Sequence, residues 1–231
     1  MDNLNKIISD ALREDVPSKD ITTHLTVTSK EKVHAKIISK ERGILCGLEI
    51  AKAVFLSVDP SLKIKRKFKD GNIIKNNQSI LEIYGKKSSI LTAERTALNF
   101  LGFTTGIATK TNHVSKKIKK YKSKVCCTRK TIPNLRNLQK YAVLIGGGTN
   151  NRMNLSDEIF VKDNHLANIK DIALLLQNVI KKNKSKKIIT VEVDTLAQLK
   201  AIKHLKINRI LFDNMQPSQI KKGIQLLPRN I

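Results

Sequence analysis

The sequence contains no tryptophan, and only three tyrosines and six phenylalanines among its 231 residues. It therefore offers no evident aromatic platform on which nucleic-acid bases could stack. Long apolar runs are missing too: the densest, Ala173–Leu176, is far shorter than the about 20 residues that cross a bilayer. The N-terminal segment Met1–Leu12 is polar and lacks the apolar stretch of a signal peptide. We therefore expect a soluble, cytoplasmic protein.

Cysteine is scarce, with Cys46, Cys126 and Cys127 and no C-x-x-C pair. Neighbouring residues of a strand point to opposite faces, so Cys126 and Cys127 are poor partners for one metal ion. We expect free thiols in a reducing compartment.

Acidic residues are absent between Glu94 and Asp157, within a chain that carries 44 basic and 19 acidic side chains and a net charge of +25. Such an excess can indicate phosphate neutralisation on nucleic acid. Lysine, isoleucine and asparagine are frequent throughout, however, which indicates a compositional bias and argues against nucleic acid as the partner. The lysines over 116–124 suit the C-terminal end of a helix. The arginines of this stretch need a separate explanation.

The first part of the chain mixes helical and extended patterns. We predict helices over 4–15 and Glu49–Val58, and strands within 32–45 and 62–84. A longer helix over about 90–120 is predicted to be capped by Ser88 or Ser89 and interrupted by Gly102 and Gly106.

After this helix, the pattern changes to short strands that alternate with helices, which predicts a parallel sheet. The predicted helices are Ile169–Ile180 and Thr195–Leu205, and the predicted strands are Lys124–Thr128, Glu158–Val161, Lys187–Val193 and Arg209–Phe212. The predicted fold class is α/β. An N-terminal α+β, sandwich-like domain over 1–104 precedes a partial α/β barrel with parallel strands over 105–231.

Charged residues follow each predicted strand, in Thr128–Thr131, Lys162–His165, Glu192–Asp194 and Asp213–Asn214. The carboxyl ends of parallel strands converge on one rim, where α/β barrels build their sites. The segment Gly146–Arg152 adds a glycine run that can expose backbone N–H groups to an anion. Together these features predict an enzyme that binds a phosphorylated, polyanionic small molecule.

These motifs, as a set, resemble quinolinate phosphoribosyltransferase, also called nicotinate-nucleotide pyrophosphorylase (carboxylating). The resemblance covers essentially the whole chain, in order. It rests on Glu94–Leu101, Gly106–Thr109, Thr128–Thr131, Lys140–Val143, Gly146–Arg152, Val161–His165, Val191–Asp194 and Leu211–Met215, with Glu14–Asp15, Asp20–Thr23 and Gly43–Gly47 before them.

The resemblance implies a pentosyltransferase of NAD biosynthesis. Quinolinate and phosphoribosyl pyrophosphate (PRPP) would give nicotinate mononucleotide, pyrophosphate and carbon dioxide, with Mg²⁺ as cofactor. The substrate-binding residues it implies are Arg95, Thr128, Arg129, Lys130, Asn151, Arg152, Lys162, Glu192 and Asp213. Lys130, Lys162, Glu192 and Asp213 would be catalytic, and Glu192 and Asp213 would hold Mg²⁺. Arg95 is expected to reach the active site of a neighbouring subunit, which implies a homodimer.

The chain departs from the family pattern at three places. Asn151 stands where histidine is common, and Cys127 stands where aspartate is common. The sequence ends at Pro228–Ile231, whereas family members continue into two further strands that hold the 5′-phosphate of PRPP. This ending predicts reduced stability or association with another fragment. Two alternatives stay open: a related phosphoribosyltransferase-like protein with a different acid substrate, and a catalytically impaired remnant or basic binding module.

Overall fold

The computed structural model describes residues 4–28 and 30–228. The chain divides into two compact units, residues 1–151 and 152–231. The predicted domain boundary between residues 104 and 105 falls inside the helix Lys87–Lys117 and stays a prediction. Residues 229–231, the last part of the predicted C-terminal end, lie outside the described residues, and so do residues 1–3 of the polar N-terminal segment.

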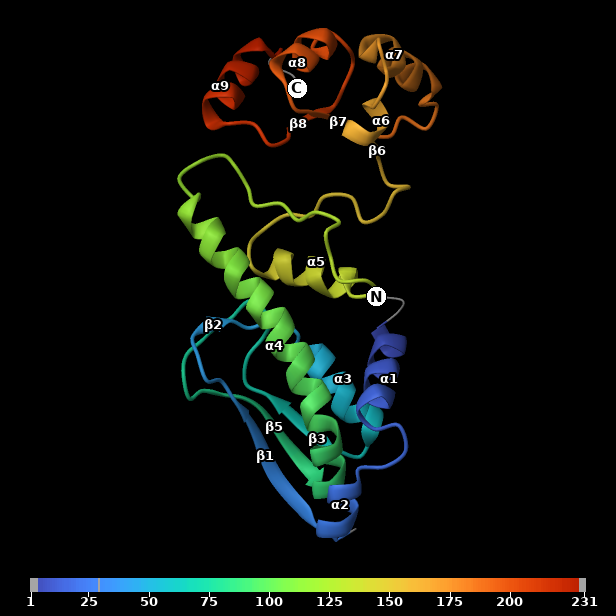
Figure 1. The fold of residues 1–231 in the computed structure, drawn as a ribbon. Helices are drawn as coiled ribbons and strands as arrows, with labels where there is room; N and C mark the ends of the chain where they lie inside the picture. The colour runs from blue at the N-terminus through green and yellow to red at the C-terminus, as the bar shows by residue number, and fades with distance from the viewer. Residues whose placement is uncertain (1–3, 29, 229–231) are drawn as a thin grey trace. The chain divides into compact units, whose positions relative to one another are not determined.

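The first unit is built from five helices and five strands in its described part (Figure 1). The helices are α1 (Leu4–Asp15), α2 (Ile21–Thr26), α3 (Leu48–Val58), α4 (Lys87–Lys117) and α5 (Arg136–Ile145). The strands are β1 (Lys32–Ile38), β2 (Gly43–Ile44), β3 (Lys63–Arg66), β4 (Ile73–Ile74) and β5 (Ser79–Lys86). The predicted helices over 4–15 and Glu49–Val58 and the predicted strand regions are confirmed.

The first unit has a three-stranded antiparallel sheet with strand order β1-β5-β3 and a two-stranded antiparallel sheet of β2 and β4. Side chains of a strand alternate between its two faces. Leu81 and Ile83 of β5 are buried in one apolar core with Val54 and Phe55 of α3 and Ala97 of α4. Burial of these side chains holds α3 and α4 to the sheet, since each buried side chain of this size contributes roughly 1.5–3 kcal/mol.

Helix α4 runs without a break through Gly102 and Gly106, so the predicted interruption is wrong. A glycine inside a helix costs about 1 kcal/mol relative to alanine, and the burial of Phe100 and Leu101 in the core outweighs that cost. The predicted serine cap is also wrong. The helix begins at Lys87, and the hydroxyl of Ser89 donates a hydrogen bond to Oδ2 of Asp59, 2.8 Å away, instead of capping the helix.

A buried polar contact ties the start of α3 to α4. The hydroxyl of Thr104 donates to the carbonyl of Cys46 at 2.6 Å, and the carboxylate of Asp70 accepts the N–H groups of Gly47 and Leu48 at 2.9 and 3.1 Å. The N-terminus of a helix leaves such N–H groups without partners and favours a negative charge. Burial raises the pKa of the Cys46 thiol to about 12, which keeps it protonated.

The predicted strand Lys124–Thr128 is present only as an isolated parallel bridge between Cys126 and Thr149, which corrects the prediction. The bridge has two backbone hydrogen bonds, from Cys127 N to Thr149 O and from Thr149 N to Val125 O. The backbone of Gly146 lies close to α4: a Cβ atom added there would be 2.4 Å from the carbonyl oxygen of Ala108. Glycine is therefore required where α5 ends against α4.

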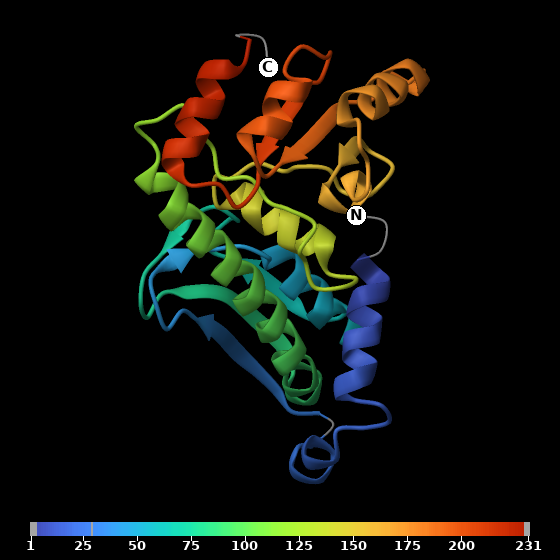
Figure 2. The same ribbon diagram turned by 45° about the horizontal axis from the view of Figure 1, so that its top comes forward.

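The second unit is a parallel sheet with helices between its strands (Figure 2). Its strands β6 (Ile159–Val161), β7 (Ile189–Val193) and β8 (Arg209–Phe212) confirm three predicted strands. The helices are α6 (Asp163–Leu166), α7 (Ile172–Lys182), α8 (Leu196–Ile202) and α9 (Pro217–Leu226). Helix α7 begins three residues later than predicted, because Asp171 is its N-cap and accepts a hydrogen bond from the N–H of Leu174.

The two faces of this sheet differ in chemistry. Val161 and Val191 are register partners and are buried in the core together with Leu176, Leu199 and Ile202 of α7 and α8. Because side chains alternate, the opposite face carries Phe160 beside Thr190 and Thr190 beside Arg209. We call this second surface the inner face; it leads to the charged residues at the strand ends.

The α+β first unit and the parallel second unit agree with the predicted fold class. Among the described residues, no helix combines the length and apolar character of a membrane span.

Candidate active site

Three of the predicted site residues meet at the carboxyl ends of β6, β7 and β8. The Nζ atom of Lys162 lies 3.4 Å from Oε2 of Glu192, whose side chain is only 5% exposed. Asp213 follows β8 directly, and its backbone N–H donates to the carbonyl of Val193 at 3.0 Å. The parallel sheet thus gathers one cation and two carboxylates that lie far apart in the sequence.

Asp194 joins the carboxylates in this cluster. Ligand oxygens of Glu192, Asp194 and Asp213 all lie within 4.8 Å of one another. Glu192 is buried, Asp213 is partly buried and Asp194 is exposed. Hard carboxylate oxygens that reach into solvent suit Mg²⁺, which usually keeps several of its waters. The residues present therefore fit the predicted metal, and Asp194 offers a third ligand that the sequence prediction left out.

Arg152 lies on the same unit, and its side chain is only 8% exposed. Its guanidinium carbon stands 4.4 Å from the centre of the Phe160 ring, and the Nζ atom of Lys162 stands 5.5 Å from that centre. Cations are attracted to the face of an aromatic ring at such distances. Phe160 therefore carries two of the predicted substrate-binding cations on one ring.

The remaining predicted residues belong to the first unit. Thr128 and Lys130 share a tight turn, in which the N–H of Lys130 donates to the Thr128 hydroxyl at 3.1 Å. The Nε atom of Arg129 is buried and has no hydrogen-bond partner among the described residues. The carbonyl of Asn151 accepts a hydrogen bond from Nζ of Lys140 at 2.7 Å. The bridge between Cys126 and Thr149 keeps these two segments together.

Arg95 is exposed on α4. The nine predicted site residues are therefore split: Arg95, Thr128, Arg129, Lys130 and Asn151 belong to the first unit, and Arg152, Lys162, Glu192 and Asp213 to the second. The division falls between Asn151 and Arg152, at the end of the segment Gly146–Arg152, which we call the glycine loop.

Several residues that shape the site had no role in the sequence prediction. Asp194 could have been predicted as a metal ligand, because it lies two residues after Glu192 and both side chains point to the same side of an extended segment. Lys140 is 1% exposed, and nothing in a lysine-rich sequence distinguishes this buried lysine from the exposed ones. Glu158 is 6% exposed, and its acidic side chain at the start of a strand resembled a surface charge.

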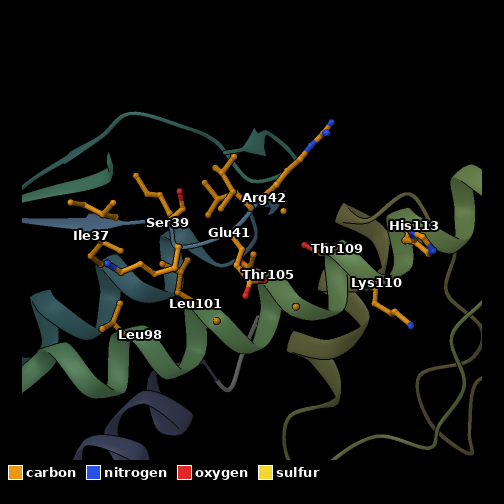
Figure 3. Close-up of a pocket in the computed structure, with 18 residues that line it drawn as sticks. Ile37, Ser39, Glu41, Arg42, Leu98, Leu101, Thr105, Thr109, Lys110 and His113 are labelled. Atoms are coloured by element: carbon orange, nitrogen blue, oxygen red, sulfur yellow. The ribbon is translucent and has the colours of Figure 1, made fainter. Parts of the chain in front are cut away.

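A separate cavity of about 690 Å³ lies along α4 in the first unit (Figure 3). Leu98, Leu101 and Thr105 of α4 line one side of the cavity. Ile37 of β1 and Ser39, just after β1, line another side. Its polar lining includes Lys40, Arg42, Lys110 and His113, together with the acidic Glu41. None of the predicted site residues lines this cavity.

Comparison with known proteins agrees with the order of an α+β unit followed by a parallel α/β unit. The family model for the N-terminal domain of quinolinate phosphoribosyl transferase matches residues 20–105, and that for the C-terminal domain matches residues 107–231. The chain thus has the two domains of a phosphoribosyl transferase. It belongs to the quinolinate phosphoribosyltransferase family.

Individual relatives lead to the same family. The probable nicotinate-nucleotide pyrophosphorylase [carboxylating] of Methanocaldococcus jannaschii is 38% identical over 96% of this chain and 77% of its own length. The Bacillus subtilis protein of the same name is 33% identical over 99% of this chain and 78% of its own length. The crystal structure of NadC from Streptococcus pyogenes superposes with a TM-score of 0.92 at 37% identity, over 97% of this chain and 79% of that one.

Proposed function

We propose that the chain transfers the phosphoribosyl group of PRPP to quinolinate and releases carbon dioxide and pyrophosphate, forming nicotinate mononucleotide. The observation that carries this proposal is the cluster of Lys162, Glu192 and Asp213 at the ends of three neighbouring parallel strands, in a chain of this family. Cations and carboxylates side by side suit a reaction whose substrates are polyanions and whose transition state is positively charged.

The arginines would bind the two carboxylates of quinolinate. A planar guanidinium group binds a carboxylate through two parallel hydrogen bonds. Arg152 is nearly buried, and the Nε donor of Arg129 has no hydrogen-bond partner among the described residues, so both suit a desolvated dicarboxylate. Thr128 and Asn151 would complete the acceptor site as hydrogen-bonding neighbours.

The lysines and carboxylates would act on PRPP. Lys130 and Lys162 would neutralise its phosphate and pyrophosphate groups. Glu192 and Asp213 would hold Mg²⁺ and face the ribose hydroxyls, and Asp194 is close enough to take part. When bound, the metal would supply positive charge to the departing pyrophosphate.

Transfer forms a bond between the quinolinate nitrogen and C1 of the ribose and breaks the bond from C1 to pyrophosphate oxygen. Positive charge builds on the sugar as pyrophosphate leaves with the bonding electrons, and the Glu192 and Asp213 carboxylates would stabilise it. The ring nitrogen is then cationic. The bond to the neighbouring carboxylate can break with its electron pair left on the ring carbon, and a proton replaces the carbon dioxide.

The predicted homodimer is part of the same proposal. Arg95, Leu98, Gly102 and Thr105 recur on α4 at spacings of three and four, so they share one helix face with the lining of the α4 cavity. Ile38 on the cavity wall is 45% exposed. An exposed arginine beside apolar surface suits a second copy that takes Arg95 into its own site. A cytoplasmic location remains a prediction.

The activity is tested by incubating the purified chain with PRPP, Mg²⁺ and quinolinate, and measuring nicotinate mononucleotide by chromatography. Nicotinate and a pyrimidine carboxylate serve as competing acceptors. Product from quinolinate alone supports the proposal. Product only from another acid would identify a related transferase, and salt-dependent nucleic-acid binding without PRPP consumption would favour a basic binding module.

The shared site is tested by mixing two inactive variants, Arg95→Ala and Lys162→Met. If Arg95 acts in the neighbouring subunit, random pairing restores one intact site in half of the dimers, about a quarter of wild-type activity. No recovery after mixing would mean that Arg95 serves its own chain or that no dimer forms.

A further inference from the structure

The inner face of the second unit carries a buried acidic residue that has no task in the proposed reaction. The side chain of Glu158 is 5% exposed and lies just before β6. Its Oε2 atom accepts a hydrogen bond from Nη1 of Arg209 at 3.3 Å. Its Oε1 atom is buried without a hydrogen bond and lies 3.9 Å from Nε of Arg152.

A buried carboxylate is expensive unless cations and hydrogen bonds compensate it. Glu158 obtains this compensation from two guanidinium groups, one on each oxygen. Two positive charges and one negative charge leave this end of the inner face with a net positive charge of one. The other end carries the carboxylates of Glu192, Asp194 and Asp213. The inner face is thus divided into a cationic and an anionic part.

We infer that Glu158 is a positioning residue, which orients the guanidinium group of Arg152 toward the acceptor dicarboxylate. Glu158 attracts the Nε side of Arg152, while the ring of Phe160 lies with its centre 4.4 Å from the carbon of the same guanidinium group. An arginine side chain loses much rotamer entropy when a ligand orders it. Two fixed neighbours remove that freedom before the ligand arrives, which strengthens binding. This inference rests on the proposed function, since it takes Arg152 as a quinolinate ligand.

The distance between Glu158 and Arg152 is informative. At 3.9 Å the pair attracts by charge but does not form a hydrogen bond. Glu158 therefore turns Arg152 without using a donor of the guanidinium group. Arg209 binds the other oxygen of Glu158 and keeps the carboxylate from swinging fully onto Arg152. The same arrangement would prevent Glu158 from competing with the substrate.

The test is the affinity for quinolinate, measured by titration calorimetry on the full chain without PRPP. We expect Glu158→Gln to raise the Kd for quinolinate at least about tenfold, while the KM for PRPP changes less than about twofold. In an Arg152→Lys background the same change should have little further effect, because a residue that acts through Arg152 is coupled to it. An unchanged Kd, or an equal loss in both backgrounds, would overturn the inference.

Two further variants keep the result interpretable. Glu49→Gln breaks an exposed ion pair with Arg66 in the first unit and should leave the Kd unchanged. If Glu158→Gln fails to fold because the nearly buried guanidinium of Arg152 is left beside Arg209 without a carboxylate, the double change Glu158→Gln with Arg209→Leu removes the second positive charge. It still deprives Arg152 of its carboxylate, and wild-type affinity in this variant would contradict the inference.

The inference and the proposed function can fail separately. A wild-type chain that binds quinolinate without turnover would contradict the proposed function, and the comparison of Kd values would still decide the role of Glu158. Full turnover by wild type with unchanged affinity in Glu158→Gln would remove the inference alone. A wild-type chain with no affinity for quinolinate would overturn both.

Discussion

The ammonium group of Lys162 lies 3.4 Å from the carboxylate of Glu192, and the two residues differ sharply in exposure, 42% against 5%. Lys162 stands directly after β6 and Glu192 lies within β7, so the parallel pairing of these strands brings them together. The lysine therefore compensates a buried carboxylate and still reaches solvent, where a phosphate could meet it.

Replacing Lys162 by methionine should lower kcat/KM at least about 100-fold, the range for removing one group that stabilises transition-state charge. The stem of the side chain is kept, so the charge is the main loss. Steady-state assays with PRPP and quinolinate measure the effect. Lys181→Met, an exposed lysine of α7 in the same unit, is the matched control and should change nothing. Equal activities of the two variants would contradict the assigned role.

The carboxylate cluster predicts binding of Mg²⁺ that depends on Asp194 as well as Asp213. Asp194→Asn keeps the shape of the side chain but removes its charge. We expect the Kd for Mg²⁺, titrated alone, to rise about tenfold or more, since even outer partners of a metal site are worth 10–100-fold in affinity. Asp10→Asn, in an exposed ion pair of α1, is the control. Wild-type Mg²⁺ affinity in Asp194→Asn would restrict the site to Glu192 and Asp213.

Much of this site could be predicted from the sequence, because its residues follow strands whose apolar pattern is clear. That pattern places Glu192 and Asp213 at strand ends, and β7 and β8 lie where it indicates. The strand predicted over Lys124–Thr128 is wrong, because this segment forms only one isolated bridge, to Thr149. A local sequence pattern does not reveal how many neighbours a segment pairs with. The interruption predicted at the glycines of α4 is wrong, because tertiary packing of the helix outweighs their low helix propensity. The pairing of Glu158 with Arg152 and Arg209 depends on register across strands, which no local pattern contains.

Gly47 is predicted to tolerate no side chain. Its φ is +98°, and an added Cβ atom would lie 2.3 Å from the hydroxyl of Thr104, which is held by hydrogen bonds to Cys46 and Phe100. Gly47→Ala should lower the free energy of unfolding by about 2 kcal/mol or more, since both strain and a clash arise. Gly71 is the control: its φ is +90° but nothing lies within 4 Å. Gly71→Ala should therefore cost only about 1 kcal/mol, and equal losses in urea denaturation would exclude the clash.

Tyr141 predicts a loss of stability at alkaline pH. Burial and its hydrogen bond to the Asp70 carboxylate, 2.7 Å away, raise the pKa of the Tyr141 hydroxyl above its usual value. Above pH about 10, the unfolded chain releases this proton while the folded chain keeps it, so stability falls as pH rises. Tyr141→Phe should cost about 1 kcal/mol near pH 7. The difference between wild type and Tyr141→Phe should shrink above pH about 10, and a constant difference would contradict the prediction.

The buried lysine of α5 has a consequence for engineering the glycine loop. Lys140 is 1% exposed, and its ammonium group holds the carbonyl of Asn151, the residue before Arg152. An insertion between Gly148 and Asn151 would draw that carbonyl away from a cation that has little access to water. This hydrogen bond therefore constrains the length of the loop, and substrate specificity is better altered by exchanging side chains of the loop than by changing its length.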